Sequence, residues 1–148
     1  MSMKPLSNGV YQIGSGMVNS YVIDGDEGVT LVDTLVPNRE GVITESLKEI
    51  GRTLDEVRAI LLTHSHNDHS GSAAAIKAES KATVYASEAD TPAIQGTVKP
   101  PHPPAPWYYR PMFGLAVFFP DAPPVDVDHF VSEDAEEQLP GDLRAIDT

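Results

Sequence analysis

The sequence predicts a single domain of the α/β class, with a mixed sheet flanked by helices. Two patterns carry this prediction. Short β-branched and aromatic runs alternate with turn residues in the first third of the chain, and later apolar runs alternate with stretches of helical spacing or composition. At 148 residues the chain has the length of one ordinary domain. We therefore expect one domain, or a large part of one, over residues 1–148.

The N-terminal third is expected to form a strand meander. Its strand-like runs cover residues 10–13, 20–23 and 29–32, and clusters of Gly and Asp separate them. A helix over about 37–50 is predicted next, because apolar residues recur there at near-helical spacing. Pro37 suits the first position of this helix, and Gly51 suits the left-handed residue that ends it.

A buried strand over 58–62 is expected to lead into the most unusual segment of the chain. Its continuous apolar character indicates burial on both faces. The histidine-rich residues 64–69 then form its C-terminal loop, the alanine-rich residues 70–77 predict a helix, and residues 82–86 predict another strand. Open α/β sheets bind ligands beyond the carboxyl ends of their strands, so the loop at 64–69 is the expected site.

A proline-rich excursion is predicted at about 97–124. Ten of the 13 prolines lie between Pro92 and Pro124, and proline sustains neither a helix interior nor a central strand. Aromatic residues are interleaved with these prolines, so the segment is either a long loop packed on the domain or a substrate lid or subunit contact. The alternating residues 143–148 predict a final strand.

Composition limits the partners that we expect. The formal charge of −12 repels phosphate backbones and anionic membrane surfaces, so nucleic acid and membranes are not expected partners. Cysteine is absent, which excludes thiolate ligands and thiol nucleophiles. We find no signal core and no apolar run of membrane-spanning length, and we expect a cytoplasmic protein.

Four potential metal ligands lie within six residues directly after the 58–62 strand. They are His64, His66, Asp68 and His69. Imidazole and carboxylate donors together suit zinc, although iron and manganese accept the same ligands. In a turn, the first two side chains and the last two address neighbouring positions, so a pair of ions sharing one water is the expected arrangement. The two remaining histidines, His102 and His129, are expected to be exposed or packing residues.

The pattern His64-x-His66-x-Asp68-His69, preceded by Ile60-Leu61-Leu62-Thr63 and by Leu31-Val32-Asp33-Thr34, resembles the metallo-β-lactamase-fold hydrolases. The resemblance implies an αββα sandwich with one or two zinc ions at the edge between its sheets. It also implies that a metal-activated hydroxide attacks an ester, thioester, lactone or amide carbonyl of a small-molecule substrate.

The resemblance further implies a role for each residue of the motif. His64 and His66 bind the first metal, and Asp68 and His69 bind the second. Asp68 is in addition the expected catalytic carboxylate, and Asp33 orients the ligand loop. Gly71 matches the glycine that follows the motif in the family, whereas Ser72 stands where a second glycine is common. Substrate-binding residues are not indicated.

The family's later ligands have no counterpart in this sequence. A third histidine, a bridging aspartate and a last histidine would follow a strand like 143–148, so the chain is expected to be the N-terminal portion of such a domain. Each metal then has two ligands here, whereas a catalytic zinc normally has three. The alternative function is therefore a truncated or non-catalytic metal-binding module. Such a module would self-associate as a homo-oligomer through its exposed apolar surface.

Overall fold

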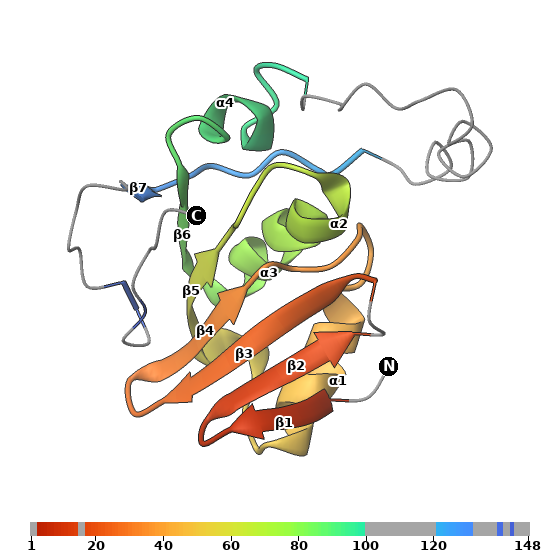
Figure 1. The fold of residues 1–148 in the computed structure, drawn as a ribbon, viewed down its shortest axis with the longest axis vertical. Coiled ribbons are helices and arrows are strands. Elements are labelled where there is room, and N and C mark those ends of the chain that lie inside the picture. Colours follow the sequence, from red (N-terminus) through yellow and green to blue (C-terminus); the bar gives the residue numbers. More distant parts are fainter. Residues whose placement is uncertain (1–2, 15–16, 100–120, 132–138, 141–142, 144–148) are drawn as a thin grey trace.

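The computed structural model describes residues 3–14, 17–99, 121–131, 139–140 and 143, which are built around one seven-stranded sheet (Figure 1). The strands follow one another across the sheet in chain order. Strands β1 to β4 pair antiparallel, and β4 to β7 pair parallel. Their bounds are β1 Met3–Ser7, β2 Val10–Gly14, β3 Asn19–Gly25, β4 Gly28–Val32, β5 Val57–Leu61, β6 Thr83–Ser87 and β7 His129–Val131. The predicted α/β class with a mixed sheet is confirmed.

The two longest helices of the described part pack on the same face of this sheet (Figure 1). Ile43 and Leu47 of α1 and Ile76 of α3 are fully buried in one cluster with sheet residues such as Leu31 and Ile60. The helices are α1 Glu40–Glu49, α2 Asn67–Ser70, α3 Ala73–Ser80 and α4 Thr91–Ile94, with a 3₁₀ turn η1 at Leu54–Glu56. Burial of this cluster is the main favourable contribution to the fold.

The strands expected at 10–13, 20–23, 29–32, 58–62 and 82–86 are present as β2 to β6, within a residue or two of their predicted bounds. Successive residues Ala59 and Ile60 of β5 point to opposite faces and are both buried, which confirms burial on both faces at the strand centre. Arg58 is exposed, so the prediction fails at the start of this strand.

The elements that were not predicted include β1, β7 and α4. Strand β1 contains Pro5, which is tolerated because β1 lies at the edge of the sheet. Strand β7 has three residues without a clear alternation of burial, and its pairing with β6 depends on contacts far apart in sequence. The short helix α4 follows Asp90 and contains Pro92 in its first turn.

The predicted helix start at Pro37 is wrong, since α1 begins at Glu40. The preceding segment is committed to other contacts: the Leu35 carbonyl accepts a hydrogen bond from the Gly71 amide at 3.0 Å. Asn38 adopts a left-handed backbone with φ of 63°, which is incompatible with continuing a right-handed helix through it. The predicted end is correct, because Gly51 adopts a left-handed backbone with φ of 77°.

The sheet face opposite the helices carries a partly exposed apolar row. Tyr21, Val32, Leu61 and Tyr85 lie side by side in register across β3, β4, β5 and β6. All four are half-buried, whereas Ile60 and other residues of the helix-facing side are fully buried. The described part of the sheet therefore carries an apolar row on this face that is half-buried rather than fully exposed.

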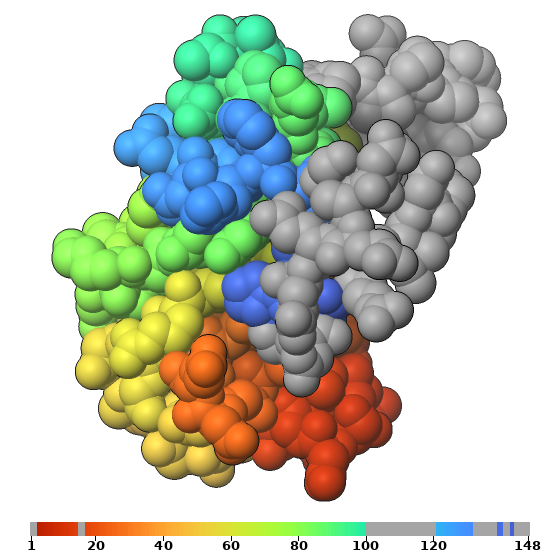
Figure 2. Space-filling model, turned by 90° about the vertical axis from the view of Figure 1, so that its left-hand side faces the viewer, coloured from red at the N-terminus to blue at the C-terminus, as the bar shows by residue number. Residues whose placement is uncertain are grey.

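The segment 121–131 returns along the outside of β6. It is joined by hydrogen bonds from the Val125 amide to the Ile94 carbonyl at 3.2 Å and from the Asp128 amide to the Val84 carbonyl at 2.9 Å. Figure 2 shows this segment in light blue, lying across the molecular surface below the green α4 region. Residues 100–120 of the proline-rich excursion predicted at 97–124, with its alternatives of packed loop, lid or subunit contact, lie outside the described part.

The final strand predicted at 143–148 falls largely outside the described residues. Leu143 is described and forms an isolated antiparallel bridge with Leu139, whose side chain is buried. Residues 144–148 are not among those that the structure describes.

Candidate metal centre

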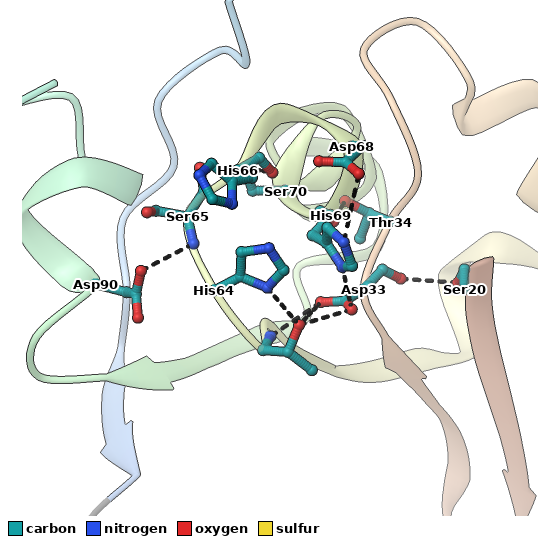
Figure 3. A network of polar contacts seen from close by, with 11 residues as sticks. Ser20, Asp33, Thr34, His64, Ser65, His66, Asp68, His69, Ser70 and Asp90 are labelled. Atoms are coloured by element: carbon teal, nitrogen blue, oxygen red, sulfur yellow. Dashed lines mark hydrogen bonds and ion pairs between the residues drawn. The ribbon is translucent and has the colours of Figure 1, made fainter. Parts of the chain in front are cut away.

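Three polar loops meet at the carboxyl ends of neighbouring parallel strands. Asp33 directly follows β4, the histidine segment follows β5, and Asp90 follows β6 (Figure 3). Because β4, β5 and β6 are parallel neighbours, their carboxyl ends lie at one edge of the sheet. This edge is where the sequence places the site.

The ligand segment is only partly a loop, which corrects the prediction for residues 64–69. His66 is the residue before α2, and Asp68 and His69 lie on that helix. The His66 carbonyl accepts hydrogen bonds from the backbone amides of His69 at 2.9 Å and Ser70 at 3.0 Å. These two bonds close a helical turn immediately after the second histidine, so the four side chains project from a short loop joined to a helix.

The structure brings the four predicted ligands together. The ring centroids of His64 and His69 are 3.9 Å apart, and those of His64 and His66 are 4.8 Å apart. Asp68 Oδ2 lies 3.5 Å from His69 Nε2. However, no group of three or more His, Cys, Asp or Glu residues within the described ranges is arranged to hold a single ion. The donor chemistry therefore fits zinc, while the described residues supply only part of a coordination sphere.

Asp33 fastens the site to the sheet. Its side chain is buried and its backbone is left-handed, with φ of 59°, a conformation that Asp adopts more readily than most residues. The Asp33 amide donates to the Leu61 carbonyl at 2.8 Å, and its own carbonyl accepts from the Ser20 hydroxyl at 2.8 Å. The backbone at this position is thus held by both neighbouring strands.

The Asp33 carboxylate contacts both parts of the ligand segment. Oδ1 accepts from the Thr63 amide at 2.9 Å, and Oδ2 lies 2.7 Å from His69 Nδ1. An ionised carboxylate only accepts hydrogen bonds, so Nδ1 of His69 carries the proton. The other ring nitrogen of His69, Nε2, faces Asp68 Oδ2 at 3.5 Å.

The tautomer of His64 follows from the same network. The Thr63 hydroxyl lies 2.8 Å from Asp33 Oδ2 and 3.1 Å from His64 Nδ1. Its single proton is donated to the carboxylate, so His64 Nδ1 donates to the hydroxyl oxygen and Nε2 retains the lone pair. Metal-binding histidines commonly have their second nitrogen held in this way.

Burial lowers the pKa of His64, and the neighbouring imidazoles of His69 and His66 lower it further. The carboxylates of Asp33 and Asp68 raise this pKa, but their effect is smaller and the pKa stays below its ordinary value. His64 is therefore neutral at pH 7, the protonation state that a metal ligand requires.

Asp90 approaches the ligand loop from the end of β6. Its Oδ1 accepts a hydrogen bond from the Ser65 amide at 3.0 Å, and its Oδ2 accepts from the Ser87 hydroxyl at 2.9 Å. Burial raises the pKa of Asp90, but the hydrogen bonds from Ser65 and Ser87 outweigh this effect and hold the pKa below its ordinary value. Asp90 is consequently ionised at neutral pH.

Sequence reasoning did not identify Thr63 or Asp90. Thr63 directly precedes the motif, and Asp90 precedes a Thr-Pro pair that is typical of a helix start. The rule that loops after neighbouring parallel strands converge would have drawn attention to Asp90. His129 lies on β7 and stacks on Tyr85 with centroids 5.2 Å apart, as expected of a packing residue. His102 lies outside the described residues.

Comparison with known proteins decides the family. The model of the metallo-beta-lactamase superfamily matches residues 13–146. The chain belongs to the metallo-beta-lactamase superfamily. The resemblance inferred from the motif and its flanking strands is thereby confirmed.

Solved metallo-beta-lactamases share the fold. The subclass B3 enzyme BJP-1 of Bradyrhizobium japonicum superposes with a TM-score of 0.75 at 29% identity, covering 94% of this chain and 48% of that one. A Cronobacter sakazakii metallo-beta-lactamase with a HARLDQ motif gives 0.74 at 24% identity, covering 94% and 51%. This superfamily member thus spans about half the length of these structures.

A curated relative is similar over a shorter stretch. The uncharacterised protein YobT of Bacillus subtilis is 35% identical over 80 residues, which are 53% of this chain and 33% of YobT.

Metallo-beta-lactamases bind metal ions, typically zinc, and act on small molecules such as β-lactams. Within the described residues, no helix has the length and apolar character needed to cross a membrane.

Proposed function

We propose that this chain carries one half of a two-metal hydrolase centre. His64 and His66 bind the first zinc ion, and Asp68 and His69 bind the second, with iron or manganese as alternative metals. The observation that carries the proposal is the convergence of three imidazoles, two of which have their Nδ1 atoms tied to the Asp33 and Thr63 network.

The residues of this chain perform two tasks in the proposed function. They hold imidazole rings in fixed directions: His64 through Thr63, and His69 through Asp33. Asp68 supplies a carboxylate next to His69, where it accepts a proton or a hydrogen bond during the reaction. Asp33 holds the ligand segment against the sheet, so the nitrogens keep their positions without rearrangement. A bound zinc ion supplies an activated water and polarises a carbonyl oxygen.

The proposed substrates are small molecules with a carbonyl group open to hydrolysis. Esters, thioesters, lactones and amides all fit the chemistry of such a centre. A β-lactam is a cyclic amide, and the 29% identity to BJP-1 makes β-lactams the first class to test. Residues that choose among these substrates are not indicated by the described part of the chain.

One observation favours a second candidate function, a metal-binding module without catalysis. The described residues contain no group of three ligands around one position, and a catalytic zinc ordinarily has three protein ligands. In this second function the half-buried row of Tyr21, Val32, Leu61 and Tyr85 is the surface of self-association.

Calorimetric titration of the metal-free chain with Zn²⁺ tests the metal site. We expect binding in the wild type and the loss of the first ion in His66→Ala, because that ion would keep a single ligand, whereas Asp68 and His69 of the second position are unchanged. His129→Ala is the matched control, since it removes an imidazole outside the motif, on β7, that stacks on Tyr85. Equal binding by His66→Ala and the wild type would contradict the assignment.

Hydrolysis assays separate the two functions. The wild type and His66→Ala are assayed with a β-lactam, a thioester, a lactone and an ester in the presence of Zn²⁺. Turnover that disappears in His66→Ala supports the hydrolase. Zinc binding without turnover, together with a concentration-dependent mass in sedimentation, supports the self-associating module.

A further inference from the structure

We propose that Asp90 is a positioning residue that sets the angle between the two histidines of the first metal position. The inference rests on the proposed metal site and names a residue outside the motif that the site depends on. Asp90 lies 25 residues beyond Ser65 in sequence, yet its carboxylate reaches the backbone between His64 and His66 (Figure 3).

Ser65 is the pivot of the ligand loop. It separates His64 from His66, and it is buried although both neighbours are partly exposed. Asp90 Oδ1 accepts from its amide at 3.0 Å, and its carbonyl accepts from the Ser70 hydroxyl at 3.3 Å. The peptide groups on both sides of the pivot are thus held, which restricts the directions of both imidazoles.

The Asp90 carboxylate is not used as an ordinary helix cap. Asp90 is the N-cap residue of α4, where an aspartate normally accepts a hydrogen bond from an amide of the first turn. No such side-chain bond is present, because Pro92 lacks an amide proton and the Ala93 amide donates to the Asp90 carbonyl at 3.0 Å. The side chain is therefore available to the ligand loop.

Ser87 fixes the direction of this carboxylate. Its hydroxyl donates to Asp90 Oδ2 at 2.9 Å and accepts from the Asp90 amide at 3.0 Å. Ser87 is the last residue of β6, so the Asp90 carboxylate is held in a fixed position relative to the sheet. The chain of contacts runs from β6 through Ser87 and Asp90 to Ser65, and it joins the ligand loop to the strand beside β5.

Three variants test this role. Asp90→Ala removes the acceptor, whereas Asp90→Asn keeps an oxygen for the Ser65 amide. Asp128→Ala is the matched control, because Asp128 Oδ2 also accepts a backbone amide, that of Val84 at 2.8 Å, and its other side-chain partner is Lys77 rather than a residue of the motif. Amide hydrogen exchange at Ser65 is measured in the metal-free protein by NMR, and affinity is measured by the visible absorption of titrated Co²⁺.

We expect Asp90→Ala to speed exchange at Ser65 by roughly tenfold or more and to weaken Co²⁺ binding by about 10- to 100-fold, the range typical of groups that support metal ligands. Asp90→Asn should restore most of both, and Asp128→Ala should change neither. Unchanged Ser65 exchange in Asp90→Ala overturns the proposal. Equal losses of Co²⁺ affinity in Asp90→Ala and Asp128→Ala overturn it as well, since they would indicate general destabilisation.

The failure of the metal site is distinguishable from the failure of this inference. If the wild type binds no Co²⁺, the proposed function fails, while Ser65 exchange and the ring nitrogen shifts of His64 and His66 in the metal-free protein still decide the positioning role. If Asp90→Ala does not fold, Ser87→Ala replaces it, because it removes only the hydroxyl that directs the carboxylate. Unchanged Ser65 exchange in that variant overturns the proposal.

Discussion

Gly71 follows α2 directly and lies against the backbone of Val36 and Pro37, in the segment that leads to α1. Adding a single methyl group at Gly71 therefore tests how tightly the site is packed. A Cβ added at Gly71 would lie 2.3 Å from Pro37 N, 2.4 Å from the Val36 carbonyl carbon and 2.4 Å from Asn67 O. All three are backbone atoms, so no side-chain rotation relieves the contacts. We expect Gly71→Ala to force the segment and the helix apart.

The magnitude follows from two contributions. Overpacking against unyielding neighbours costs about 1–3 kcal/mol, and the close approach to three backbone atoms places Gly71→Ala at the upper end. Separation also weakens the hydrogen bond from the Gly71 amide to the Leu35 carbonyl, 3.0 Å long, which adds about 1 kcal/mol. A total near 4 kcal/mol lowers the melting temperature by roughly 8–16 °C for a chain of this size.

Thermal unfolding followed by circular dichroism measures this change. Gly41→Ala is the control, because Gly41 lies in the first turn of α1 and an added Cβ meets no atom within 4 Å. There the same substitution should stabilise the helix by about 0.5–1 kcal/mol, so the two variants shift the melting temperature in opposite directions. A Gly71→Ala melting temperature within about 2 °C of the wild type would refute the packing argument.

Two further predictions concern Asp33, whose carboxylate bonds Thr63 and His69, and Asp128, whose carboxylate bonds Lys77 and the Val84 amide. Asp33→Ala leaves His69 Nδ1 without its buried acceptor, and urea unfolding should show a loss of about 3 kcal/mol; a loss below about 1 kcal/mol would count against the central role of Asp33. Burial raises the pKa of Asp128, but the Lys77 ammonium and the Val84 amide outweigh burial and hold the pKa below its ordinary value of 3.8. Asp128 therefore contributes stability above that value and loses it as the pH falls through the lower pKa of the folded state. The stability difference between the wild type and Asp128→Asn should shrink as the pH falls from about 5 to about 2, and a constant difference would contradict the assignment.

Short-range patterns were sufficient for most of the fold. The β-branched runs predicted β2 to β6, and the apolar stripe from Ile43 to Leu47 predicted the body of α1. Both patterns record which face of an element is buried, and that information lies within a few neighbouring residues. Gly51 likewise marked the end of α1, because its left-handed backbone is a local requirement.

Elements that depend on distant partners were missed. The start of α1 is delayed to Glu40, because the Leu35 carbonyl pairs with Gly71 and Ser72 bridges the intervening turn. Ser72 stands where the family commonly has a second glycine, and its hydroxyl forms two hydrogen bonds, with the Arg39 amide and the Val36 carbonyl, that a glycine could not form. Strand β7 forms where the segment 121–131 is joined to β6, and no pattern within its three residues announces that contact.

The sequence by itself determined that four candidate metal ligands follow a buried strand, and this was enough to indicate the family. Their identity and spacing are local properties of six residues. Only the tertiary structure decided which imidazole nitrogens are held by hydrogen bonds, because Asp33 and Thr63 meet Nδ1 of His69 and His64 across the ends of β4 and β5. Only the tertiary structure also revealed the hydrogen bond between the Asp90 carboxylate and the Ser65 amide, because the carboxyl ends of parallel strands become neighbours only when the sheet forms.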